Sequence, residues 1–144
     1  MDAAEPSSNN ISASNLYRLA SMLEDEEYRK HAKETVQAFE AEVEQFPWCF
    51  AGMLGSVVVG RLGGKGVVVT GLGTNTGEVE KGKAADIVKR LREKVGVGRT
   101  VVALGRGVGE WIKERNSLLE DLDVEREGVM VCEGGVCRPG EEFL

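Results

Sequence analysis

Histidine and clustered positive charge are nearly absent from this sequence. His31 is the single histidine, lies in a segment that predicts a helix, and has no Ser or Cys nucleophile that can be assigned to it. A zinc ion needs four good ligands, and besides Cys132 and Cys137 the chain offers only Cys49 and His31, with none to spare, so we expect no metal and no cofactor. The formal net charge is -6 and no Lys/Arg stripe is present, which argues against nucleic acid as a partner.

Long apolar runs are missing too. The longest, residues 48–59, is interrupted by Gly52 and Gly55 and falls short of the ~20 residues that span a bilayer, so no membrane partner is expected. The first five residues lack the basic and apolar regions of a secretory leader. Three cysteines without a leader indicate a reducing compartment, and we therefore expect a cytoplasmic protein.

The first 62 residues predict helices only. Ser12 is a candidate N-cap for a first helix, Asp25 for a second, and Pro47 ends the second. A third helix is predicted over residues 48–62, and its apolar side chains surround it almost completely. Since such a helix is normally buried on most sides, we expect apolar surfaces here that other protein covers.

The pattern changes after a glycine-rich break at residues 63–66. Short β-branched runs at 67–70, 100–104 and 129–132 alternate with amphipathic helices. The order β-α-β-α-β predicts a three-stranded, mainly parallel sheet with right-handed crossovers. We therefore expect a mixed fold, with an α-helical hairpin segment over residues 1–62 and a small α/β domain over residues 63–144.

A parallel sheet of this kind would gather ligands beyond the carboxyl ends of its strands. Those ends are Gly71, Gly105 and Cys132, which we expect at one edge, although glycines there can equally serve only to turn the chain. Residues 77–84 nearly spell a phosphate-binding loop, but Ala84 stands where a Ser or Thr would hold Mg²⁺. A nucleotide-binding module is therefore a weak alternative.

Cys132 and Cys137 form a candidate thiol pair. Four residues separate them, whereas a thioredoxin-type redox motif has two. Glu133-Gly134-Gly135-Val136 would be pliable enough for a disulfide to close the loop. Free thiols with a packing role, redox pairing and metal binding all remain open.

A set of polar residues precedes the first helix. Asp2, Glu5, Ser7 and Asn9 are candidate pocket-lining residues, because paired carboxylates can act as acid and base in sugar chemistry. A solvated tail is the simpler interpretation of the same residues. No compact catalytic constellation appears anywhere in the sequence, so we assign no catalytic residue.

Two segments resemble a known family. The first is Asp2-Ala-Ala-Glu5-Pro6-Ser7-Ser8-Asn9 with Ala13-Ser-Asn15-Leu16-Tyr-Arg18-Leu19, and the second is Val131-Cys132-x4-Cys137-Arg-Pro139. Together they resemble the C-terminal region of the spermatogenesis-associated protein 20 family of thioredoxin-domain-containing proteins. The resemblance implies a parent protein with a thioredoxin-like domain, an α/α toroid of the six-hairpin glycosidase kind, and a small α/β tail.

This chain matches only the last toroid helices and the tail. The resemblance therefore implies a C-terminal fragment of a longer protein, without catalysis of its own and with a structural or interaction role. Its partner would be the missing N-terminal part of the parent, or a second copy of the chain. It also places Asp2, Glu5, Ser7 and Asn9 in a connection that faces the toroid cavity. The alternative is that the chain is part of a carbohydrate-active or thiol-redox enzyme.

Overall fold

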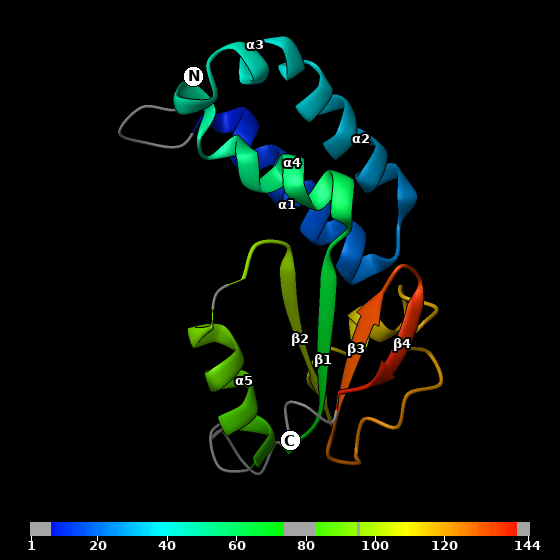
Figure 1. Ribbon diagram of the computed structural model, residues 1–144. Helices are drawn as coiled ribbons and strands as arrows, with labels where there is room; N and C mark the ends of the chain where they lie inside the picture. The colour runs from blue at the N-terminus through cyan, green and yellow to red at the C-terminus, as the bar shows by residue number, and fades with distance from the viewer. Residues whose placement is uncertain (1–6, 74–82, 95, 141–144) are drawn as a thin grey trace.

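A computed structural model of the chain describes residues 7–73, 83–94 and 96–140. A layer of helices sits across one end of a twisted β-sheet (Figure 1). In chain order the elements are α1 (Ser8–Leu23), α2 (Glu26–Gln37), α3 (Glu40–Gln45), the 3-10 helix η1 (Pro47–Phe50), α4 (Met53–Leu62), β1 (Lys65–Leu72), α5 (Lys83–Glu93), β2 (Arg99–Gly105), α6 (Glu110–Lys113), β3 (Gly128–Glu133) and β4 (Val136–Pro139).

Side-chain caps define where the first two helices begin. The Ser7 hydroxyl, and not that of Ser12, caps α1 by accepting a 3.4 Å hydrogen bond from the backbone N–H of Asn10. Asp25 caps α2, since its Oδ1 accepts a 2.9 Å hydrogen bond from the backbone N–H of Glu27. Glu24 between them adopts a left-handed conformation with φ of 51°, so the chain reverses in two residues and the helices lie side by side (Figure 1).

The two longer helices predicted after residue 25 are each interrupted. The predicted second helix breaks at Phe39, whose ring turns toward Phe50 with their centroids 6.1 Å apart, and continues as α3. The predicted helix over 48–62 begins instead with the 3-10 turn η1, which starts at Pro47, a residue whose fixed φ suits a first helical position. The α-helical part starts only at Met53, after Gly52.

The sheet has four strands in the order β2-β1-β3-β4, and only β2 is parallel to β1. Strand β3 runs antiparallel to β1, and β4 runs antiparallel to β3. The expectation of a three-stranded, mainly parallel sheet is therefore wrong. The β-α-β-α-β order does not hold at its second crossover, because residues 106–127 contain only the four-residue helix α6 and turns.

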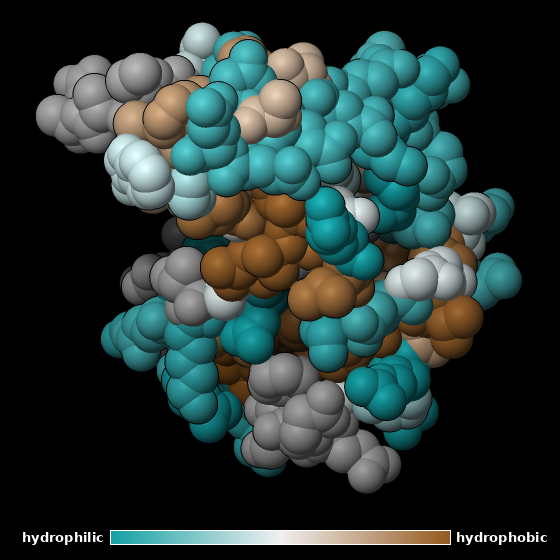
Figure 2. Space-filling view, turned by 45° about the horizontal axis from the view of Figure 1, so that its top comes forward, coloured by the Kyte–Doolittle hydropathy of each residue, from teal (hydrophilic) through white to brown (hydrophobic). Residues whose placement is uncertain are grey.

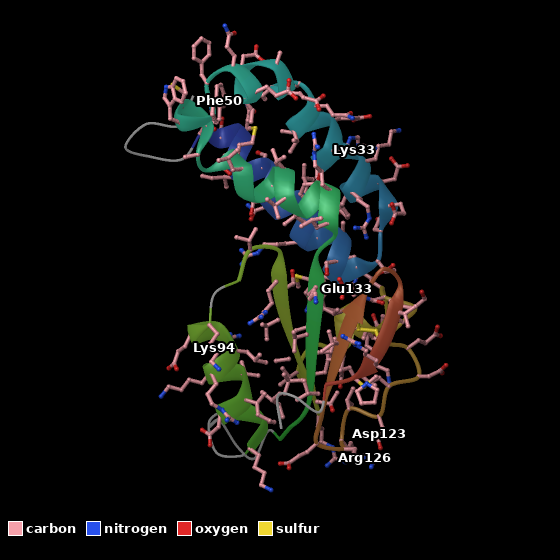
Figure 3. All side chains as sticks on the ribbon, viewed as in Figure 1. Lys33, Phe50, Lys94, Asp123, Arg126 and Glu133 are labelled. Carbon is pink, nitrogen blue, oxygen red and sulfur yellow. A yellow bond between two sulfur atoms is a disulfide. The ribbon has the colours of Figure 1, made fainter. Side chains whose placement is uncertain are left out.

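That connection leads the chain to the far end of β1 rather than back to its start. The backbone N–H of Gly71 donates to Val124 O at 3.0 Å, and the Thr70 hydroxyl donates to Arg126 O at 2.7 Å. Residues 124–126 are thus fixed beside the carboxyl end of β1, where Arg126 lies in Figure 3. Strand β3 must then enter antiparallel. Gly134 and Gly135, both with positive φ, form the two-residue turn into the unpredicted β4.

Each face of the sheet has its own core. On one face, Val67 and Val69 pack with Ile87, Val88 and Leu91 of α5. The other face buries a second group, made of Val68, Val102, Leu104, Ile112 and Leu119 with Met22 of α1 packed against it. The Asn116 amide also donates to the Met22 carbonyl at 2.9 Å. These contacts join the helical layer to the sheet.

Only one side of α4 is covered by the other described residues. Met53 and Ser56 are buried, but Leu54, Val58 and Leu62 are exposed by 38%, 46% and 77%. These three residues are spaced four apart, so they form one apolar stripe along the helix, called here the α4 stripe. Figure 2 shows hydrophobic residues gathered across the middle of one face, below the hydrophilic surface of the upper helices. In the described part of the chain, no helix is long and apolar enough to cross a membrane.

Candidate functional site

The predicted ligand edge does not exist as a single edge. Leu72, which follows Gly71, pairs with Gly105, so both glycines lie at the carboxyl end of the parallel pair. Cys132 pairs with Gly66 at the opposite end, because β3 is antiparallel. A Cβ on Gly105 would collide with the carbonyl oxygen of Leu72. Gly71 and Gly105 therefore permit close backbone packing, a role that neither of the two interpretations included.

The predicted polar set is only partly described. Asp2 and Glu5 lie outside the described residues, as do residues 77–82 of the near phosphate-binding loop. Ser7 is the N-cap of α1 and Asn9 is exposed on its first turn. Ala84 is buried at the start of α5, on the far side of the sheet from α1.

A different site lies between the helical layer and the end of the sheet at which β1 and β2 begin. It is a cleft of about 630 Å³, which we call the interlayer cleft. One wall comes from α1 and α4, and the other from the glycine-rich turns before β1 and β2 and the turn between β3 and β4. Figure 3 shows Glu133, from the hairpin wall, at the end of the sheet nearest the helices. The volume of the interlayer cleft lies within the range of ligand-binding pockets.

Four buried polar side chains line the interlayer cleft. Their exposed fractions are 8% for Asn10, 7% for Tyr17, 4% for Ser56 and 7% for Thr100. Among the residues that the structure describes, none of these side chains has a hydrogen-bond partner. Every fully enclosed side-chain nitrogen or oxygen in the same part of the chain is paired, so the polar atoms of these four residues keep some contact with solvent.

Tyr17 connects the two helices that form the upper wall. Its hydroxyl lies so close to Gly60 of α4 that a Cβ there would collide with it. Burial raises the pKa of the Tyr17 phenol, and the positive charge of Arg29 opposes part of that rise. The phenol is therefore neutral at physiological pH and can both donate and accept a hydrogen bond.

Charged groups surround the cleft, and several are already paired. Arg29 Nε and Glu26 Oε1 are 2.8 Å apart, and Lys65 Nζ is 3.3 Å from Glu133 Oε2. Arg99 donates through Nη1 to the Lys94 carbonyl at 3.1 Å. Arg18 and Glu24 also line the cleft, and neither has an ion pair with any described residue.

A disulfide joins Cys132 to Cys137 in the wall of the same cleft. The two residues are directly paired across β3 and β4, with their Cα atoms 4.0 Å apart. Cys132 lines the cleft, while Cys49 is a free, half-buried thiol in η1. In the described ranges, no three His, Cys, Asp or Glu side chains are grouped closely enough to hold a metal ion.

Sequence reasoning missed the cleft because its walls come from distant segments. Two signals were available in the sequence. Ser56 interrupts the apolar run of α4, and glycines precede both parallel strands, at positions 63 and 64 before β1 and at 96 and 98 before β2. Comparisons of this chain with protein-family models, with curated proteins and with solved structures found no match.

Proposed function

We propose that this chain is an interaction module, the C-terminal part of a protein of the spermatogenesis-associated protein 20 type, with no catalysis of its own. The observation that supports this role is the α4 stripe. Three large apolar side chains on one helix face solvent together, and Leu62 is 77% exposed. Single exposed apolar residues are ordinary on protein surfaces, but an aligned row of them marks a surface that binds protein.

The partner that fits the stripe best is another α-helix. Leu54, Val58 and Leu62 form a ridge of residues four apart, which packs into the groove of a second helix. The resemblance implies the helices of an α/α toroid as that partner, with a second copy of the chain as the substitute when the chain is alone.

Self-association of the isolated chain tests the proposal. We expect sedimentation velocity to show concentration-dependent dimers, which Val58→Glu abolishes because a carboxylate in an apolar contact loses its water. The matched control is Val136→Glu, an equally apolar and 67% exposed site on β4, which should leave the dimers intact. A monomeric wild-type chain with one cooperative unfolding transition would contradict the interaction role.

Thiol–disulfide exchange is a second candidate, favoured by the position of the Cys132–Cys137 bond. The pair joins neighbouring strands at the edge of the sheet, and Cys132 lines a cleft that a small thiol can enter. Thiol counting of the unfolded chain should find one reactive thiol before reduction and three afterwards. Three reactive thiols in the unreduced protein would eliminate this candidate.

A further inference from the structure

We propose that the interlayer cleft binds a small polyhydroxylated molecule that carries one anionic group, of the sugar-phosphate or sugar-acid class. This inference does not depend on the proposed docking role. The cleft is lined by Gly55, Ser56 and Val59 of α4 and by Gly52 before it, whereas the α4 stripe consists of Leu54, Val58 and Leu62, none of which lines the cleft.

The hydroxyl groups of the ligand are inferred from the four buried polar side chains. Asn10, Tyr17, Ser56 and Thr100 approach the cleft from α1, α4 and β2 and leave their hydrogen-bonding capacity unused within the described chain. An amide and three hydroxyls each donate and accept, so their best complement is a set of groups that do the same. Sugar hydroxyls meet that requirement, whereas an apolar ligand would leave the four side chains desolvated and unpaired.

The anionic group is inferred from the charges that remain unpaired. Glu26 and Glu133 are neutralised by Arg29 and by Lys65. The remaining charges at the cleft are the guanidinium groups of Arg18 and Arg99, which have no carboxylate partner among the described residues, and the carboxylate of Glu24. The six charged side chains that line the cleft sum to zero, but Lys65 outside the cleft pairs with Glu133, so two guanidinium groups face one unpaired carboxylate. Guanidinium groups bind phosphate and carboxylate through paired hydrogen bonds, which favours a ligand with one such group.

Binding of defined probes tests the inference. We expect glucose 6-phosphate and gluconate to raise the melting temperature, glucose to do so less, and inorganic phosphate alone not at all. Isothermal titration should give at least a tenfold weaker Kd for glucose 6-phosphate with Ser56→Val and with Thr100→Val. Arg18→Gln should weaken the binding of glucose 6-phosphate and leave the shift in melting temperature with glucose unchanged.

The matched control is Thr70→Val. Thr70 is a buried threonine of the neighbouring strand, but its hydroxyl is hydrogen-bonded to Arg126 O, away from the cleft. This variant should lose stability and keep the wild-type Kd. No thermal response to any probe at about 10 mM would overturn the proposed site, and so would an unchanged Kd in both cleft variants. Neither outcome bears on the dimers that test the docking role.

Discussion

Two buried threonines on adjacent strands should lose different amounts of stability on the same substitution. Thr70 on β1 and Thr100 on β2 are 3% and 7% exposed, and valine has nearly the same shape as threonine. The Thr70 hydroxyl donates to Arg126 O at 2.7 Å, whereas the Thr100 hydroxyl has no hydrogen-bond partner among the described residues and Thr100 lines the interlayer cleft. Replacing each threonine by valine therefore removes a hydroxyl and keeps the shape of the side chain. The hydroxyl of Thr70 has a hydrogen-bond partner in the protein, and that of Thr100 has none in the part of the chain that the structure describes.

The hydrogen bond sets the magnitude of the difference. Losing one well-formed bond destabilises a protein by about 1 kcal/mol, and the carbonyl that loses its donor adds to that when it stays buried. Arg126 is exposed, so water can reach its carbonyl, and we expect Thr70→Val to lower the unfolding free energy by about 1–1.5 kcal/mol. For a chain of this size that corresponds to a melting temperature about 3–5 °C lower. Thr100→Val should change the unfolding free energy by less than about 0.5 kcal/mol.

Guanidinium unfolding followed by circular dichroism measures both variants against wild type. Equal slopes of free energy against denaturant would show that the unfolded states are comparable. A Thr100→Val variant as unstable as Thr70→Val would refute the reasoning. It would mean that the Thr100 hydroxyl has a partner of its own and that the cleft does not offer it for binding.

Three further predictions concern the sheet, the disulfide and the helices. Gly105→Ala should destabilise the chain by more than about 3 kcal/mol, because the added methyl meets neighbouring backbone; Gly73→Ala, with open space around it, should be nearly neutral in the same unfolding assay. Replacing Cys132 and Cys137 together by serine should lower the unfolding free energy by about 2 kcal/mol, because the unfolded chain gains entropy without the disulfide. A reductant should then leave the stability of this double variant unchanged. Burial raises the pKa of Tyr17, so the phenol keeps its proton to a higher pH in the folded protein than in the unfolded chain, where its pKa is 10.0. The unfolding free energy should therefore fall above that pH. Phenolate absorbance of the wild type, compared with that of Tyr17→Phe, measures the shift.

Local pattern was sufficient for most elements and insufficient for their arrangement. The β-branched runs at 67–70 and 100–104 lie in β1 and β2, because such residues fit strands covered on both faces. Strand direction depends on where the preceding connection is fixed, and that depends on Thr70 and Gly71 binding residues 124–126. No periodicity in the sequence reports such a contact between distant segments.

The candidate site was harder to predict for the same reason. The sequence drew attention to Asp2 and Glu5, which precede the first helix, and to glycines at strand ends. The cleft instead uses Asn10 and Tyr17 from the buried side of α1, together with Thr100 from β2. Each of these polar residues looks ordinary in its own segment, and only the packing of helices over the start of the sheet brings them together.

The position of β1 at the centre of the sheet has a consequence for synthesis on the ribosome. The helical cluster of Val43, Phe50 and Met53 can close as soon as its own residues emerge. Strand β1 comes next but has both neighbours still to be made, and the one formed by residues 128–133 arrives some sixty residues later. Until then its run of valines is an open template for other nascent chains, so a stalled product that stops before residue 128 should be a strong client for chaperones.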